Sequence, residues 1–274
     1  MLYVSMPTFH TPRRLLQRAV RSVLAQTYPD LRLVVVCDGD RTVDLSAFDD
    51  HRLIRFDLSK NRGRYFADAT VLAALNDDDW WSPHDSDDWS EPDRFEHLMA
   101  AAQHTGAAVA PHWSHRGERR TLSMPKMAGT GFRFTAHWCT GVYRKDVVLG
   151  IGGLGPQFRV GYDTLFTSLL PMVYDVAVDP VPGYHWVRRQ NSLTTSNGTS
   201  FHSALREQTK MELRRMYDEA GHGHRRGRSV ADIIANQCPA AVLAEVQRRS
   251  VELRTALQPE ATNVPELQNR PMLR

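Results

Sequence analysis

Apolar and polar positions along the first hundred residues alternate between strand-like and helix-like patterns. The apolar runs at residues 2–6, 31–37 and 52–56 predict strands, and the second run is so continuous that both of its faces should be buried. Apolar residues recur at helical spacing over residues 12–24 and 65–73, which predicts two amphipathic helices. The order strand, helix, strand, strand, helix is typical of a mainly parallel sheet covered by helices.

The rest of the chain adds elements of both kinds. Thr11 is expected to cap the first helix, with Pro12 as its first residue. Residues 202–257 carry the pattern of two or three amphipathic helices, and the tail from Pro259 is expected to be loosely ordered. Further helices are expected over residues 92–106 and 162–173, and further strands over residues 80–84, 107–113, 137–143, 174–179 and 184–189.

The composition favours an ordinary globular protein. Hydrophobic residues make up 42% of the 274 residues and charged residues 24%, and the net charge of +3 gives no reason to expect nucleic acid as a partner. The 3 cysteines are far apart, which suits a reducing compartment and excludes a disulfide framework. The longest strongly apolar run, residues 33–37, is far shorter than a membrane span. We therefore expect a cytoplasmic protein with no integral membrane span.

Polar clusters follow four of the predicted strands. The carboxyl ends of parallel strands meet at one edge of a sheet, where such sheets bind their ligands, so these clusters are expected to share one site. The clusters are Pro7 and Thr8, Asp38 to Asp40, Asn61 to Arg64, and Asp85 to Asp88.

Asp85, Ser86 and Asp87 form a D-x-D pattern directly after a short predicted strand. Two carboxylates at a strand end supply the oxygen ligands that Mg²⁺ or Mn²⁺ prefers, and the cation can bridge them to a diphosphate. A solvated acidic turn is the usual alternative for an isolated D-x-D, but the position at the sheet edge favours a ligand site. The acidic run at residues 77–79 precedes the strand and is interpreted as a surface loop that ends a helix.

Two further clusters suit a nucleotide. Asp38 and Asp40 stand in a turn where Gly39 permits close backbone approach, and a carboxylate there can accept a hydrogen bond from a nucleobase N–H. A plain turn explains these residues equally well. Arg64 has a planar guanidinium suited to phosphate, and the alternative is a solvated surface arginine.

Other candidate residues have a structural explanation as well as a functional one. The pairs His112 with His115 and His222 with His224 lack a carboxylate in helical register and are interpreted as structural or solvated. Trp113 and Trp138 are candidates for lining a ligand pocket, with core packing as an equal alternative. The basic, glycine-flanked residues 117–131 predict a lid that closes over a bound ligand.

Taken together, these segments resemble the N-terminal half of a family 2 glycosyltransferase with the GT-A fold. The resemblance extends to about residue 98 and is most specific in RSVLAQTYPDLRLVVVCDG, residues 21–39. It implies an α/β, Rossmann-like catalytic domain over residues 1–200, whose mainly parallel sheet is flanked by helices, and a C-terminal helical extension and tail over residues 201–274. The nucleotide-sugar-binding half would be residues 1–110 and the acceptor-binding half residues 111–200.

The resemblance also implies ligands and roles. The sugar would come from a nucleotide-diphospho-sugar, a UDP-sugar, with Mn²⁺ or Mg²⁺ held by Asp87 and Asp85. Asp163 stands where the family carries its catalytic base, although this chain has Tyr162 in front of it where the family has Glu, and an N-cap role for Asp163 is an open alternative. The residues implied to bind the nucleotide sugar are Pro7, Thr8, Asp38, Asn61, Arg64, Asp85, Ser86 and Arg189, the last standing where a histidine is common. Arg188 and His185 are the alternative contacts to the diphosphate.

We therefore expect an inverting, metal-dependent glycosyltransferase acting on a hydroxyl or amine of a soluble acceptor, such as a natural-product core or a glycan. The C-terminal helices would allow a homodimer. One alternative is an enzyme of surface-polysaccharide assembly. A nucleotidyltransferase is another, although the loop after the first strand lacks the glycines usual in that class. A third is a non-catalytic sugar-nucleotide-binding module, which Tyr162 would permit.

Overall fold

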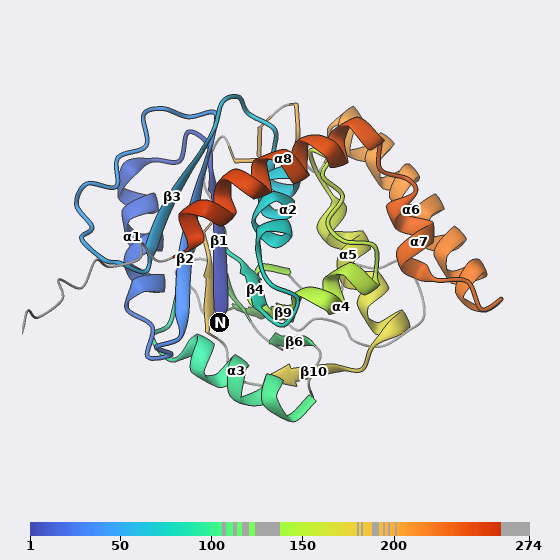
Figure 1. Cartoon of the computed structure of the whole chain (residues 1–274), viewed down its shortest axis with the longest axis horizontal. Helices are drawn as coiled ribbons and strands as arrows, with labels where there is room; N and C mark the ends of the chain where they lie inside the picture. Colours follow the sequence, from blue (N-terminus) through green and yellow to red (C-terminus); the bar gives the residue numbers. More distant parts are fainter. Residues whose placement is uncertain are drawn as a thin grey trace, which may run out of the picture.

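The fold is α/β, and its main sheet is mainly parallel, as predicted. The computed structural model describes residues 1–105, 108–111, 114–116, 121–123, 138–179, 181, 183–187, 192–193, 195–196, 198–200 and 202–258. In this part of the chain, a seven-stranded sheet has the order β10-β6-β9-β4-β1-β2-β3 (Figure 1). Only β9 runs antiparallel to its neighbours there. The strands are β1 Leu2–Thr8, β2 Leu31–Asp38, β3 Leu53–Leu58, β4 Trp80–Pro83, β6 Ala108–Pro111, β9 Val142–Arg144 and β10 Val176–Asp179.

Helices cover both faces of this sheet. Successive residues of a strand point to opposite faces, and in β1 Leu2 and Val4 belong to one hydrophobic cluster while Tyr3 belongs to the other. The first cluster includes α1 (Arg13–Leu24) and α3 (Arg94–Thr105). Burial on both faces explains why the central strands read as continuous apolar runs. The helices of the second cluster are α2 Arg64–Ala74, α4 Lys145–Gly150, α5 Tyr162–Val173, α6 Ala204–His224, α7 Val230–Ala235 and α8 Ala240–Leu257.

The last helix, α8, lies across α2 (Figure 1). Leu253 of α8 is fully buried in the cluster that also contains α2. Arg254 donates hydrogen bonds to the carbonyls of Ala73 and Ala74, at 3.0 and 3.1 Å. The last carbonyls of a helix have no partner within it, so Arg254 satisfies the end of α2. Because α2 begins at Arg64, α8 helps to fix the helix that carries a predicted site residue.

We expect Arg254→Met to lower the free energy of unfolding by about 1 kcal/mol, the usual scale for lost hydrogen bonds. Arg248→Met is the matched control, because Arg248 lies on the same helix and its contact is a surface pair with Glu252. Urea unfolding of both variants measures the difference. Equal midpoints for the two would show that the Arg254 contacts with α2 contribute nothing to stability.

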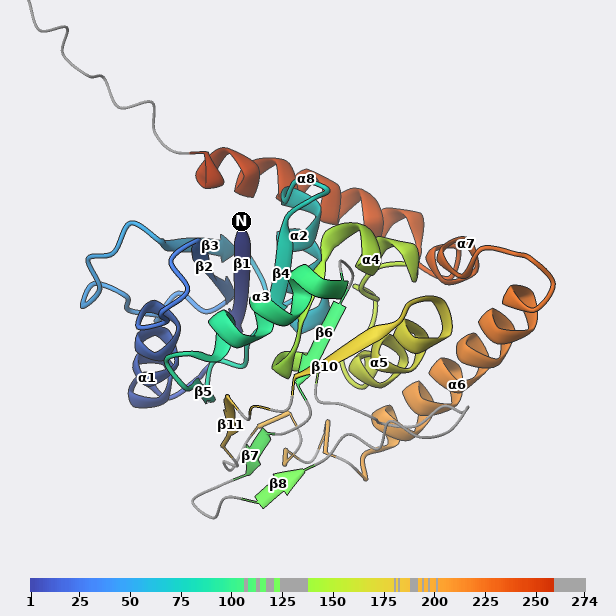
Figure 2. The same cartoon turned by 90° about the horizontal axis from the view of Figure 1, so that it is seen from below.

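A smaller sheet lies apart from the main one (Figure 2). Its order is β5-β11-β7-β8, and β5 follows directly on the acidic turn at residues 85–88. The predicted lid at residues 117–131 lies outside the described residues except for β8. The strands are β5 Trp89–Ser90, β7 Ser114–Arg116, β8 Thr121–Ser123 and β11 Tyr184–Trp186.

Two local predictions were wrong. The helix α1 begins at Arg13 with Pro12 at the N-cap and no side-chain cap, because the Thr11 hydroxyl is instead hydrogen bonded to Ser86, 2.7 Å away. The strand predicted at residues 137–143 begins only at Val142, because Trp138–Thr140 forms a 3₁₀ turn. Tyr143 donates to the carbonyl of Trp138 (2.9 Å), a side-chain contact that periodicity does not reveal.

Candidate active site

Four parallel strands bring their polar ends to one edge of the main sheet. Thr8 is in register with Cys37, the residue before Asp38, and Ser5 is in register with Pro83, just before the acidic turn. The loop that leads from β3 into α2 ends at Arg64 on the same edge. The structure therefore brings together the polar clusters that the sequence pattern placed at this edge.

Asp38 organises the loop that precedes α2. Its side chain is buried, and its two carboxylate oxygens accept hydrogen bonds from the backbone N–H groups of Arg62 (2.7 Å) and Gly63 (2.8 Å). Burial raises the pKa of Asp38, while these two hydrogen bonds act in the opposite direction. Gly39 has a φ of +78° and lies so close to this loop that a Cβ there would be 2.3 Å from the backbone nitrogen of Asn61. Recognition of a nucleobase by Asp38 stays a prediction.

Other predicted site residues at this edge differ in their hydrogen bonds and burial. Asp40 accepts a hydrogen bond from the backbone N–H of His10 at 2.8 Å, which ties the loop after β1 to the end of β2. Asn61 accepts a hydrogen bond from Arg159 and is half-buried. Pro7 is also half-buried, whereas Thr8 is buried and its hydroxyl oxygen has no hydrogen-bond partner among the described residues. A buried hydroxyl without a partner costs free energy, which makes Thr8 a candidate for contact with a ligand.

Arg64 is a fixed bridge between α2 and the acidic turn. Its guanidinium pairs with Asp68 (3.1 Å) and with Asp85, and it lies 4.9 Å over the ring of Trp138. Asp68 is fully buried and also accepts a hydrogen bond from Ser5 at 2.5 Å. Burial raises the pKa of Asp68 to about 6 although Arg64 and Ser5 favour its ionised form. The alternative of a solvated surface arginine is therefore wrong for Arg64.

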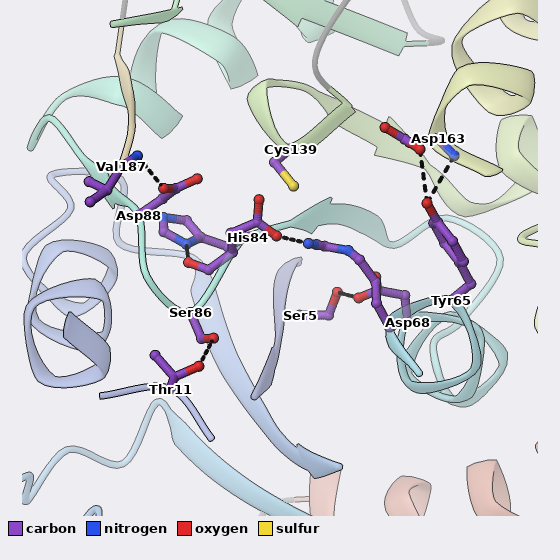
Figure 3. Close-up of polar contacts among 12 residues, drawn as sticks. Ser5, Thr11, Tyr65, Asp68, His84, Ser86, Asp88, Cys139, Asp163 and Val187 are labelled. Carbon is purple, nitrogen blue, oxygen red and sulfur yellow. Dashed lines mark hydrogen bonds and ion pairs between the residues drawn. The ribbon is translucent and has the colours of Figure 1, made fainter. Parts of the chain in front are cut away.

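The acidic residues after β4 divide into two kinds. Asp88 is fully buried, and its carboxylate accepts a hydrogen bond from the Tyr184 hydroxyl at 2.7 Å. It also accepts one from the Val187 N–H at 2.7 Å (Figure 3). The Tyr184 hydroxyl in turn accepts from the N–H of Asp85 at 3.1 Å. Burial, with the neighbouring Asp87, raises the pKa of Asp88 well above its ordinary value. Asp88 thus fastens the turn to the second sheet, and half-buried Asp85 and Asp87 remain as candidate ligands.

The backbone of this turn is held from inside the protein as well. His84 is fully buried, and its ring nitrogens lie 2.8 Å from the carbonyl oxygen of Asp85 and 3.0 Å from the hydroxyl of Ser90. Ser86 is buried and hydrogen bonded to Thr11, while Arg18 donates to the carbonyl of Asp87 at 3.1 Å. These hydrogen bonds therefore fix the conformation of the turn.

The donor set of this turn fits a hard cation only in part. Among the described residues, no group of three or more His, Cys, Asp or Glu side chains could hold a metal ion. Asp85 and Asp87 offer carboxylate oxygens, and Mg²⁺ is commonly held by one or two carboxylates together with substrate phosphates. The two residues therefore fit a cation shared with a diphosphate rather than a metal site complete within the protein.

Asp163 lies in the first turn of α5 and contacts α2. Gly161, with a φ of +81°, occupies the N-cap of α5, and no side chain caps that end, so the N-cap alternative for Asp163 is wrong. Instead, Asp163 accepts a hydrogen bond from the Tyr65 hydroxyl at 2.9 Å (Figure 3). Tyr162 is fully buried and donates to the carbonyl of Gly153 at 3.1 Å, so it supplies no second acidic group.

Several other predicted residues have simpler surroundings or cannot be placed. Arg188, Arg189, His112 and Trp113 lie outside the described residues. The ring of His185 stacks on Trp89, and its Nε2 lies 2.7 Å from a carboxylate oxygen of Glu91. The ring of His222 is exposed and hydrogen bonded to a carbonyl of its own helix. This agrees with the interpretation of His222 as structural or solvated.

The acidic run at residues 77–79 lies at the opposite edge of the sheet. Asp79 is buried, with a carboxylate oxygen 3.5 Å from the amino group of Met1, where β1 begins. Asp77 pairs with Lys145 at 3.0 Å. These carboxylates have structural partners at the amino ends of the strands, which agrees with the interpretation of the run as a loop.

Sequence reasoning missed Tyr65, Asp68 and Tyr184. Asp68 could have been found, because a carboxylate four residues after an arginine on an otherwise apolar helix indicates an ion pair. Tyr65 and Tyr184 had no such signal, since their partners are 98 and 96 residues away in the chain.

Residues 3–149, more than half of the chain, match the family described as Glycosyl transferase family 2. The chain belongs to this family. As a family 2 member, it has an acidic turn, an arginine on α2 and an aspartate at the end of β2, all at the edge that the sequence resemblance indicated. No curated protein sequence gives a significant match.

Solved structures agree on the fold. TarS of S. aureus, residues 1–349, in complex with UDP-GlcNAc has a TM-score of 0.59 to this family 2 chain at 17% identity, covering 70% of this chain and 59% of that chain. The complex of the same fragment with UDP has a TM-score of 0.57 at 14% identity, covering 93% and 89%. The first match thus spans less than two thirds of the TarS fragment. These likenesses show the GT-A fold. No helix in the described ranges has both the length and the apolar character to cross a bilayer.

Proposed function

We propose that this chain is an inverting, metal-dependent glycosyltransferase that moves a sugar from a UDP-sugar to a hydroxyl or amine of a soluble acceptor, such as a natural-product core. The observation that carries the proposal is the pairing of Arg64 with Asp85, in the turn that also carries Asp87, at the carboxyl edge of the sheet. A guanidinium and two carboxylates at one edge suit a diphosphate and a divalent cation bound together. The TarS complexes with UDP-GlcNAc and UDP support a uridine nucleotide as the leaving group.

In the proposed reaction, Asp163 accepts the proton of the acceptor hydroxyl or amine as that group attacks the anomeric carbon. The bond between the anomeric carbon and the diphosphate oxygen breaks, and the electron pair leaves with the diphosphate. Arg64 can neutralise part of the charge on the leaving group. One displacement inverts the anomeric centre, and no covalent intermediate forms on the protein.

Asp87 and Asp85 would hold the cation. When bound, Mg²⁺ or Mn²⁺ offsets the charge that grows on the leaving diphosphate. Asp85 is paired with Arg64 in the structure, so the arginine holds this carboxylate at the edge where the cation would be shared. The protein's part is to hold both carboxylates in place.

A thermal-shift experiment tests the proposal. We expect UDP with Mn²⁺ to raise the melting temperature by about 5–10 °C at a concentration of about 100 times Kd, because a ligand of the folded state stabilises it by about 2.7 kcal/mol there. UDP with EDTA should give a much smaller shift. Release of UDP from UDP-GlcNAc by the same protein separates an enzyme from a binding module. Identical shifts with and without the cation would contradict the metal role.

Thr8→Val makes this experiment residue-specific. The Thr8 hydroxyl has no partner among the described residues, so its removal should leave the melting temperature of the free protein unchanged or raised. If the hydroxyl contacts the nucleotide, affinity for UDP should fall by roughly three- to tenfold, the value of one hydrogen bond. An unchanged affinity would remove Thr8 from the nucleotide site.

A further inference from the structure

Tyr65 connects the two ends of the candidate active site. It follows Arg64 in the first turn of α2, and its hydroxyl donates to Oδ1 of Asp163 at 2.9 Å. The backbone N–H of Asp163 also approaches this hydroxyl, at 3.4 Å. Arg64 pairs with Asp85, so adjacent residues of one helix contact the candidate base and a candidate metal ligand.

The Tyr65 hydroxyl is a permanent hydrogen-bond donor. The side chain is buried, with Trp138 and Tyr162 at ring-centroid distances of 5.3 and 5.8 Å. Burial, reinforced by the Asp163 carboxylate, raises the pKa of Tyr65 well above its ordinary value, while Arg64 acts in the opposite direction. The phenol therefore stays protonated at neutral pH and donates to the carboxylate throughout the reaction.

We propose that Tyr65 is the positioning residue for the base: it fixes the plane of the Asp163 carboxylate and sets its distance from the cation-binding turn. This inference rests on the proposed function, in which Asp163 accepts the acceptor's proton. A hydrogen bond to Oδ1 limits rotation of the carboxylate, so the other oxygen, Oδ2, is held in one orientation. Tyr65 and Arg64 are adjacent in the first turn of α2, so holding Asp163 and Asp85 from these two residues keeps base and leaving group at a constant separation.

The residue before Asp163 does not share this role. Tyr162 is directed to the carbonyl of Gly153, so it does not hold the Asp163 side chain. Within the described residues, the hydrogen bond that reaches the Asp163 carboxylate comes from Tyr65.

Tyr65→Phe tests this role, because phenylalanine keeps the buried ring and removes only the hydroxyl. We expect kcat for release of UDP from UDP-GlcNAc to fall roughly 10- to 100-fold, the scale at which a misplaced catalytic group loses rate. KM for UDP-GlcNAc should change less than about twofold, since binding of the nucleotide does not use the hydroxyl. Tyr162→Phe is the matched control: it removes another buried hydroxyl from a neighbouring ring, and its kcat should stay within about twofold of wild type.

A double variant separates positioning from a general effect on folding. In the Asp163→Asn background, Tyr65→Phe should cause no further loss of kcat, because a positioning residue acts only through the group that it holds. Multiplicative losses would overturn the inference, as would equal losses for Tyr65→Phe and Tyr162→Phe. Loss of turnover in Asp163→Asn with normal kcat in Tyr65→Phe would overturn this inference and leave the proposed function intact. Absence of UDP release by the wild-type protein would overturn both.

Discussion

Asp163→Asn should reduce turnover by roughly 10²–10⁴-fold, the usual cost of removing a general base. Asparagine has nearly the same shape and can still accept the hydrogen bond from Tyr65, so the first turn of α5 should stay intact. The amide cannot take a proton from the acceptor. We therefore expect a nearly unchanged melting temperature and unchanged binding of UDP, with the loss confined to kcat.

Asp232→Asn is the control for this experiment, because Asp232 also lies in the first turn of a helix, α7, and has no place in the site. Loss of a favourable interaction with the helix dipole is then common to both variants. A well-folded Asp163→Asn protein with near-normal turnover would show that another group is the base. Asp175, Asp179 and His112 would be the next residues to replace.

Asp87→Asn should cost roughly 10²–10³-fold in kcat, the scale of removing one group that stabilises charge in the transition state. The variant should also lose the stimulation by Mn²⁺ that the wild-type enzyme is expected to show. Asp78→Asn is the matched control, because Asp78 is an exposed carboxylate of the loop before β4 and Asp87 belongs to the turn after it. The length of β4 separates the two positions.

Titration of both variants with Mn²⁺ in the UDP release assay makes the comparison. Asp78→Asn should follow the wild-type curve, since the carboxylates beside it have structural partners at the amino edge of the sheet. If both variants lose activity equally, the effect comes from the net charge of the protein and not from ligation at the turn.

Much of this fold could be predicted because its strands and helices carry strong local patterns. The run at residues 31–37 is continuous because helices cover both faces of β2, and the helical spacing after Pro12 reflects one buried stripe of α1. Placement of Asp38, Arg64 and Asp85 at one edge followed from the parallel order of the strands alone. Topology therefore carries more of the site than any single motif does.

What could not be predicted depends on contacts between distant parts of the chain. The three carboxylates after β4 are alike in sequence, yet Asp88 is buried because Tyr184 and Val187 reach it from a second sheet. The bond between Tyr65 and Asp163 likewise depends on how α2 and α5 pack. The spacing of residues in the sequence reveals such a contact only when both partners lie on the same helix or strand.

The position of α8 has a consequence for how the molecule is made. This helix spans residues 240–257, and it packs over α2 and β3, whose residues are synthesised about 180 positions earlier. On the ribosome, the apolar surface beneath α8 therefore stays exposed until α8 has been synthesised, and exposed apolar surface of this kind promotes aggregation. The nascent chain should gain resistance to proteolysis in this region only after α8 has emerged.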